Sequence, residues 1–484
     1  MKFMKKRLKR VKTDKKEDGK SFKLKSLFKS SHLWEWAWGI GLGTCLSLLF
    51  LLPSAKGITL FNKLGMIILI TLFIIILFIY WRHFYPRSLS PKLLFLSLIL
   101  IILTCLMGRV IILLPNISIY FIPLPFLSIL FSLFFEFPLS LVVTLFLSLL
   151  FSINAGSLPL IPVLMVGGII GAYSACFIHE RVDLSRGGIY IGVSNVCAVW
   201  AVGLLSSYSP LKIVSLSLWG IANGLFSSIL ALTLLPYLET YFGITTDIKL
   251  LELSNPNHSL LRRLSIEAPG TYHHAVIVAS LAEAAAESIR SNPLLCKVGA
   301  YYHDIGKVLR PHFFFENTGA TKEDYHERVT PNLSSTIIIS HVKDGVELAQ
   351  ETRLPQDVID IIEQHHGKGL MAYFYRKALL KVKKDKESIN EESFRYAGPK
   401  PQTKEAGIVM LADSVEADFR FSPSTSSKGI EAQIKRVVEN KMKDGQLEEC
   451  DLTLKEIADI IEAFTRVLTG LVHTRRGYPV RSSE

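Results

Sequence analysis

The chain divides into two halves that differ in their pattern of hydrophobic and polar positions. From residue 33 to about residue 237, apolar blocks follow one another with few charges, whereas the chain after Glu239 mixes charged and apolar residues. A bilayer core of about 30 Å needs roughly 20 apolar helical residues. Eight blocks approach that length: residues 34–53, 60–81, 93–115, 118–135, 137–153, 157–178, 187–207 and 213–236. The fourth and fifth blocks are separated only by residues 136–138 and form either two spans or one re-entrant pair.

The second half shows helical periodicity rather than the alternation of strands. Apolar residues recur at helical spacing in residues 273–290, 357–366 and 434–445, and a further helix is expected to begin near Leu333. A polar loop is expected at residues 381–404. We therefore predict an all-α protein with three parts. They are a basic cytoplasmic tail (1–32), a transmembrane domain of about eight helices (33–237) and a cytoplasmic helical domain (238–484).

Positive charge favours one orientation of the spans. The net charge is +12, and the first thirty residues carry thirteen Lys and Arg against three acids. Such a run can bind nucleic acid, but beside a span it more often marks the cytoplasmic side and contacts anionic lipid. The loops 81–92 and 180–186 also carry Lys or Arg, so both termini are expected in the cytoplasm. This reading predicts a multi-pass membrane protein, with the bilayer and no DNA or RNA as partner.

Few polar residues lie inside the apolar blocks. Arg109, close to the end of the third block, is either a functional intramembrane charge or, as we expect, a side chain that reaches the interface. Asn195 and Asn223 are expected to form interhelical hydrogen bonds. None of the six cysteines forms a C-x-x-C pair, which argues against a disulfide framework and a thiolate zinc site.

Ten of the thirteen histidines lie in the second half, several of them beside one another or beside an acid. The series is His273 and His274, His303 and Asp304, His341, His365 and His366, and Asp413. Helical bundles build metal sites from imidazoles and carboxylates that project inward from different helices. Adjacent residues on a helix diverge by about 100°, so His303 and Asp304 must serve different centres unless one of them bridges.

A carboxylate has two oxygens, so Asp304 can join two metal ions while His303 binds one. Two ions a few Å apart stabilise the attacking and leaving oxygens of a phosphoryl displacement. Mixed His and Asp ligands without thiolates suit Mn²⁺ or Fe²⁺. Lys307, one turn after His303, is expected to meet a phosphate or to remain solvated. His258, His312, His326 and His473 are expected to be hydrogen-bonded core residues rather than ligands.

The ordered motifs of the second half resemble the HD superfamily of metal-dependent phosphohydrolases, and more closely its membrane-bound seven-transmembrane branch of the PgpH type. They include "EAPGTYHHAVIVASLAEAAAE", "AYYHDIGK", "IIISHVKDGVELA", "EQHHG", "RYAGPKPQTKEA", "MLADSVEA" and "DGQLEECDLTLKEI". The resemblance implies a dinuclear enzyme that hydrolyses cyclic di-AMP to pApA and so lowers the level of a second messenger. It also implies the ligands: His274, His303, Asp304 and Asp413 for one ion, and Asp304, His341, His365 and His366 for the other.

The sequence departs from this family in three places. The family usually carries a large extracytoplasmic domain after the first span, where this chain has only "SAKGIT". The segment "ENTGATKEDYHERVTP" lacks the usual asparagine-proline pair, and Ser259 replaces a common proline. None of these positions is an expected ligand.

Other functions remain open at this point. Related HD domains hydrolyse guanosine tetraphosphate or cyclic di-GMP, although "HHGKGL" lacks the Gly-Tyr-Pro that accompanies the latter activity. A non-catalytic nucleotide receptor would be expected to have lost ligands, and a transporter would be expected to have polar spans. The oligomeric state is open as well, a homo-oligomer included.

Overall fold

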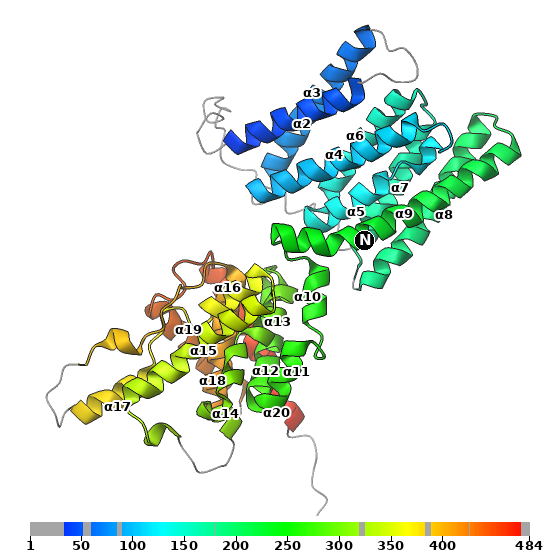
Figure 1. Cartoon of the computed structure of the whole chain (residues 1–484). Helices are drawn as coiled ribbons and strands as arrows, with labels where there is room; N and C mark the ends of the chain where they lie inside the picture. Colours follow the sequence, from blue (N-terminus) through cyan, green and yellow to red (C-terminus); the bar gives the residue numbers. More distant parts are fainter. Residues whose placement is uncertain are drawn as a thin grey trace, which may run out of the picture. The chain divides into compact units, whose positions relative to one another are not determined.

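The computed structural model describes residues 33–51, 60–84, 90–178, 180–318, 325–382, 389–424 and 426–475. In these ranges the chain is helical and has no strand, only an isolated bridge between Leu370 and Arg395 (Figure 1). The all-α prediction is confirmed. The predicted basic tail, residues 1–32, lies outside the described residues.

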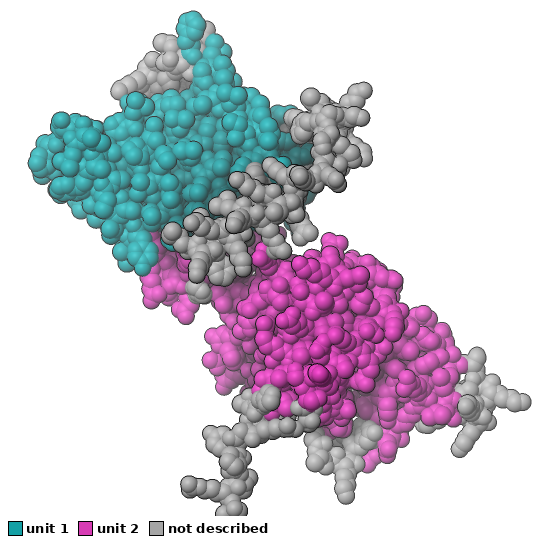
Figure 2. All heavy atoms as spheres, turned by 180° about the vertical axis from the view of Figure 1, so that it is seen from behind, with its two compact units in different colours: residues 1–173, 188–227 teal, residues 174–187, 228–484 magenta. Residues whose placement is uncertain are grey.

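Two compact units share the chain (Figure 2). Unit 1 contains residues 1–173 and 188–227, and unit 2 contains residues 174–187 and 228–484. Two long helices, α8 (Arg181–Leu205) and α9 (Pro210–Phe242), contribute to both units. Because α9 also runs through the predicted domain boundary at residues 237 and 238, that boundary stays a prediction.

Each apolar block of the sequence contains one main helix. Besides α8 and α9, these helices are α2 (Leu33–Leu51), α3 (Leu60–Phe84), α4 (Pro91–Leu113), α5 (Leu124–Phe134), α6 (Phe137–Ala155) and α7 (Leu160–Ala175). A 3₁₀ turn, η4 (Ile119–Phe121), precedes α5. Among the described residues, five helices are long and apolar enough to cross a membrane, namely α3, α4, α6, α8 and α9.

The fourth block differs from its neighbours because Pro123 interrupts it. Helix α5 has 11 residues, which corresponds to about 16 Å and is far short of a bilayer core. It packs against α6 through a hydrogen bond of 2.6 Å between the hydroxyls of Ser128 and Thr144. The Ser140 hydroxyl also donates to the Ser128 carbonyl. Helix α5 is therefore too short to be a span by itself, whereas α6 has the length of one.

The polar residues of the apolar blocks are buried between helices. Asn195 donates to the carbonyl of Gly220, and Asn223 donates to two carbonyls, one within η4 and one directly after it, so the predicted interhelical hydrogen bonds are confirmed. The prediction for Arg109 is wrong. Its side chain is 3% exposed and donates to Asn154 Oδ1 on α6, because a polar partner on a neighbouring helix replaces the interface.

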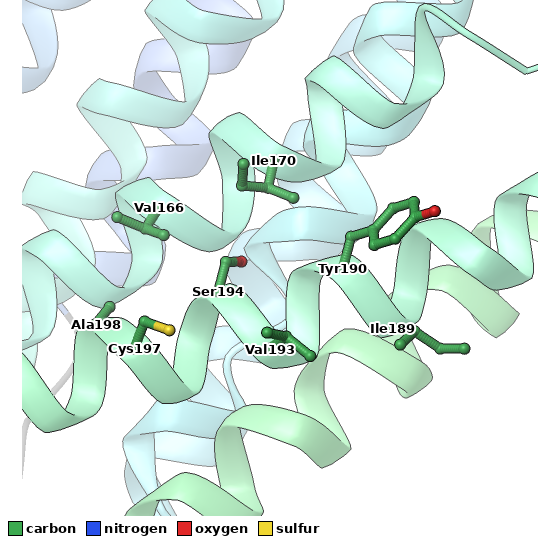
Figure 3. Close-up of a pocket in the computed structure, with 8 residues that line it drawn as sticks. All are labelled: Val166, Ile170, Ile189, Tyr190, Val193, Ser194, Cys197 and Ala198. Atoms are coloured by element: carbon green, nitrogen blue, oxygen red, sulfur yellow. The ribbon is translucent and has the colours of Figure 1, made fainter.

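An apolar pocket of about 600 Å³ lies in unit 1, where α7 and α8 face each other (Figure 3). Its lining consists of Val166, Ile170, Ile189, Tyr190, Val193, Ser194, Cys197 and Ala198. No carboxylate, imidazole or amine contributes to this lining, so the pocket offers no general acid, general base or metal ligand of those types.

Unit 2 is a bundle of shorter helices. They are α10 (Asp247–Leu253), α11 (Ser259–Glu267), α12 (Pro269–Ile289), α13 (Pro293–Tyr302), α14 (Phe315–Thr318), α15 (Pro331–Glu351), α16 (Gln356–Gln364), α17 (Ala372–Val382), α18 (Lys404–Phe421), α19 (Ser427–Lys443) and α20 (Leu454–Arg475). The 3₁₀ turns are η5 (Ile305–Leu309), η6 (Pro311–Phe313), η7 (Tyr325–Glu327) and η8 (Glu391–Phe394).

Local sequence explains where several of these helices begin. Asn292, Thr330 and Thr403 each accept a hydrogen bond from the backbone three residues on, and each caps a helix. A proline follows the first two caps at a position that has no intrahelical bond to lose. Helix α15 thus starts two residues before the expected Leu333.

Two apolar clusters hold unit 2 together. One joins α12, α13, α18, α19 and α20 around Leu281, Met410 and Phe464, and the other joins α10, α11, α13, η5 and α16 around Leu264 and Ile362. Helix α13 contributes to both clusters. Its C-terminal end, where the HD pair lies, is therefore anchored from two sides.

Candidate metal centre

The seven predicted ligands come from five segments of unit 2 and meet in one place. They are His274 on α12, His303 and Asp304 between α13 and η5, His341 on α15, His365 and His366 after α16, and Asp413 on α18. All except His366 are less than a tenth exposed. Their donor atoms form two groups, Asp304 with His341, His365 and His366, and His274 with His303 and Asp413. Within each group these atoms lie within 4.8 Å of one another.

Asp304 stands between the two groups. Its Oδ1 lies 3.2 Å from His341 Nε2 and 3.7 Å from His365 Nε2. Its Oδ2 lies 3.2 Å from His303 Nε2 and 3.5 Å from His274 Nε2. Each carboxylate oxygen therefore faces a different pair of imidazoles, which is the arrangement that a bridging carboxylate requires.

The side chains of His303 and Asp304 both point to the centre because the α-helix has ended before these two residues. Helix α13 stops at Tyr302, and Asp304 has φ −106° and ψ 16° before the chain continues as η5. The expectation that the two side chains diverge as on a helix is wrong, because that spacing applies only while the helix continues. Bridging by Asp304 does not depend on that expectation.

A close backbone contact holds this turn against α15. A Cβ atom on Gly306 would lie 2.0 Å from the carbonyl oxygen of His341 and 2.5 Å from the nitrogen of Gly345. Only a residue without a Cβ fits there. The glycine of the "HDIGK" motif thus brings Asp304 within reach of His341.

Three of the histidines are oriented by the backbone. The Nδ1 atoms of His303, His341 and His365 lie 2.5–2.7 Å from the carbonyl oxygens three residues earlier. A carbonyl only accepts, so each Nδ1 carries a proton and each Nε2 points to the centre, where it offers a lone pair when the imidazole is neutral. Metal-binding histidines typically donate their other nitrogen in this way.

His274 is held by a carboxylate that sequence reasoning did not single out. Its Nδ1 lies 2.6 Å from Glu416 Oε2 and 2.6 Å from Arg420 Nη2, and Arg420 also pairs with Glu416. The neighbouring His273 is exposed. Position alone could have suggested Glu416, because it follows Asp413 by three residues and so shares its face of α18.

The donor atoms fit divalent cations better than they fit one another. With their protons on Nδ1, His341 and His365 turn two Nε2 lone pairs toward each other at 3.4 Å. His303 Nε2 and Asp304 Oδ1 are buried and form no hydrogen bond with the described part of the chain, whereas Asp304 Oδ2 contacts the Lys307 ammonium. Two cations between these groups would satisfy all of them. No cysteine belongs to either group, in line with Mn²⁺ or Fe²⁺.

The pKa shifts of His303 and of Asp304 also show that positive charge is favourable in the centre. Burial lowers the pKa of His365 to about 3 and holds that of His366 well below its usual value, so both imidazoles are neutral at physiological pH. Burial alone would lower the pKa of His303, yet Asp304 and Asp413 raise it to about 10. Burial likewise opposes ionisation of Asp304, but His303 and Lys307 lower its pKa well below the ordinary range.

Lys307 contacts carboxylates at the edge of the centre. Its Nζ lies 2.6 Å from Asp304 Oδ2 and 2.8 Å from Glu316 Oε1. Burial opposes its charge, yet the two carboxylates raise its pKa. The predicted contact with a phosphate stays a prediction. What the geometry assigns to Lys307 is the orientation of Asp304.

The remaining histidines lie outside the two groups. His258 bonds to the hydroxyl of Tyr302 and His326 to the carbonyl of Phe313, as expected of partly buried structural histidines. His312 is exposed, so its assignment to the core is wrong. The side chain of His473 lies outside the described residues.

Two family models match the chain in the order of its two halves. Residues 60–246 match the family described as "7TM receptor with intracellular HD hydrolase". Residues 271–418, which include all seven donors, match the HD domain. The chain belongs to the membrane-bound HD-domain family. It is accordingly a membrane protein.

Relatives of this HD family support the assignment. The chain is 43% identical over 317 residues to the cyclic-di-AMP phosphodiesterase PgpH of Bacillus subtilis (strain 168), an alignment that covers 65% of this chain and 44% of the relative. It is 41% identical over 314 residues to PgpH of Listeria monocytogenes serotype 1/2a (strain 10403S), covering 64% and 43%. The chain thus spans less than half of the length of these relatives.

Solved structures of an HD domain are also similar. A crystal structure of the L. monocytogenes PgpH HD domain is 46% identical in sequence, with a TM-score of 0.42. The match covers 45% of this chain and 100% of the crystallised chain. A second structure of that domain, in complex with cyclic-di-AMP, has the same identity and TM-score and 99% of its chain is covered.

Proposed function

We propose that this chain is a membrane-anchored phosphodiesterase that hydrolyses cyclic di-AMP to pApA and thereby lowers the level of this second messenger. The observation that carries the proposal is Asp304, whose two oxygens face two separate groups of imidazoles. The relatives named as cyclic-di-AMP phosphodiesterases support the substrate.

The residues of the centre would divide into two ligand sets. His274, His303 and Asp413 would hold one divalent ion, and His341, His365 and His366 the other, with Asp304 shared. Ions held there would supply polarisation of a phosphodiester and activation of water for in-line attack. The backbone carbonyls that accept from Nδ1 keep each imidazole turned inward, and Lys307 fixes the bridging carboxylate.

Burial of the centre strengthens the electrostatic interactions of its side chains. His303, Asp304, His341 and His365 are each at most 1% exposed. Electrostatic interactions are stronger where water is excluded, and donors that are already oriented need no rearrangement during the reaction.

The substrate can be tested on the full chain in detergent or nanodiscs, loaded with Mn²⁺ or Fe²⁺. Turnover of cyclic di-AMP, cyclic di-GMP and guanosine tetraphosphate is compared and the products are separated by chromatography. We expect cyclic di-AMP to be consumed fastest, with pApA as the product. Preference for either other nucleotide would overturn the substrate, and binding without turnover would favour a receptor.

We also propose that the protein crosses the membrane several times and that both termini and the HD unit lie in the cytoplasm. The long apolar helices support several crossings, and the Lys and Arg residues of the N-terminal run and of loop 81–92 support a cytoplasmic N-terminus. Fusion of alkaline phosphatase or green fluorescent protein after residue 484 tests it. We expect a fluorescent and phosphatase-inactive C-terminus, whereas active phosphatase would place the HD unit outside.

A further inference from the structure

Two lysines lie near the candidate centre, and their amines have different surroundings. The amine of Lys307 contacts Asp304 and Glu316 and therefore has two carboxylate partners. The amine of Lys441, at the end of α19, forms no hydrogen bond and no ion pair within 4.0 Å among the residues that the structure describes. Lys441 is nevertheless partly buried.

Packing of the end of α19 explains why Lys441 is there. Gln446, just beyond this helix, accepts a hydrogen bond of 2.8 Å from the backbone nitrogen of Lys368. This contact docks the end of α19 on the turn that follows His366. A Cβ atom on Gly369 would lie 3.7 Å from Lys441 Nζ, and the nitrogen of Gly369 donates to the carbonyl of His366. The amine thus stands beside the turn that begins at a candidate ligand.

Nearby acids do not neutralise this amine. Asp444, three residues on, is engaged with Arg395 and with Gln446. Asp413 influences Lys441 through space but lies beyond ion-pair distance. Burial lowers the pKa of Lys441, and both acids only partly offset this shift. A partly desolvated ammonium without a partner is unfavourable, and an anion beside it would relieve that cost.

We propose that Lys441 binds the phosphate of the cyclic dinucleotide that is not being hydrolysed. This inference rests on the proposed function. The reacting phosphate must contact both groups of donors at Asp304, whereas the Lys441 amine lies outside ion-pair distance of that centre. A cyclic dinucleotide carries a second phosphodiester in the same ring. Lys441 would hold this group while the first one reacts.

The test is Lys441→Met in the full chain, with KM and kcat measured for cyclic di-AMP and for bis(p-nitrophenyl) phosphate, a diester with a single phosphate. Loss of a charged hydrogen bond should raise KM for cyclic di-AMP about ten- to hundredfold. Turnover of the single-phosphate diester should be unchanged, and so should the bound metal. Lys441→Arg should restore most of the affinity.

The matched control is Lys443→Met, which removes an exposed lysine from the same helix and should leave both substrates unaffected. An unchanged KM for cyclic di-AMP in Lys441→Met would overturn the assignment. An equal fall in kcat for both substrates would also overturn it, because the lysine would then act on the reacting phosphate. A wild-type chain that does not turn over cyclic di-AMP would refute the proposed function and the assignment together.

Discussion

Buried polar side chains differ in kind between the two units. In the described part of unit 1 they are hydroxyls and amides, with Arg109 as the single charged residue: Ser97, Thr104, Ser128, Ser140, Thr144, Ser148, Ser152, Asn154, Asn195, Ser217, Asn223 and Ser227. In unit 2 imidazoles and carboxylates are prominent: Glu239, His274, His303, Asp304, His341, His365, Asp413 and Glu416.

The partners of these groups explain the difference. Hydroxyls and amides of unit 1 bond to backbone carbonyls or to one another, as Ser128, Thr144 and Asn223 do, and such bonds hold helices together in a membrane. In unit 2, lone pairs of His341 and His365 face each other. Burial of polar groups therefore stabilises packing in unit 1, while in unit 2 it leaves donors that a metal would complete.

The largest effect is expected from Asp304→Asn, which removes one of the two oxygens on which bridging depends. Metal ions contribute several kcal/mol to transition-state stabilisation, so activity should fall about a thousandfold or more. Bound metal, measured by elemental analysis, should fall as well. Asp357→Asn, at an exposed position of α16, is the control. Full activity in Asp304→Asn would contradict the claim that the buried polar groups of unit 2 are metal donors.

Gly306→Ala should destabilise unit 2 through the backbone. The new Cβ would lie 2.0 Å from the His341 carbonyl oxygen, and overpacking of this kind costs about 1–3 kcal/mol. Thermal unfolding of the full chain measures the loss. Gly470→Ala on α20, where a Cβ meets nothing within 4 Å, should not destabilise the protein. Equal stability of the two variants would contradict the close approach of η5 and α15.

Glu416→Ala should weaken metal binding without unfolding the protein. Partners that orient a ligand are worth about 10–100-fold in metal affinity, and Glu416 is such a partner of His274. Glu416→Gln keeps an acceptor for the Nδ1 proton and should lose less. Metal titration of the full chain distinguishes the two. If both variants bind metal as the wild type does, Glu416 does not position His274.

The smallest effect is expected from Asn223→Leu in unit 1. It removes hydrogen bonds of 2.8 Å to the carbonyls of Tyr120 and Ile122, and the loss should be about 1 kcal/mol. Thermal unfolding in detergent measures it, with Leu218→Ala at a 64% exposed position of the same helix as control. Metal content should not change. A large loss of metal would contradict the claim that the buried polar groups of unit 1 serve packing alone.

The apolar pattern predicted most of the helices but not their exact lengths or the partners of their polar side chains. Apolar blocks of the right length located every helix of the first half, including the interruption near Glu136. The apolar pattern alone missed that Pro123 shortens α5, although a proline is a local signal. It could not show that Arg109 donates to Asn154, because that contact joins two helices. His312 was assigned to the core by residue type and is exposed.

The candidate centre was predictable as a set of residues, partly from the clustering of histidines and partly from family resemblance. Its geometry was not, because His274 and Asp413 are 139 residues apart and still lie 3.1 Å from each other. Residue order alone specified where helices form and which side chains can bind metal, since both follow from local chemistry. Tertiary packing decided that α13 ends before His303, that Glu416 holds His274 and that Lys441 keeps an unpaired amine, since each depends on what distant segments bring alongside.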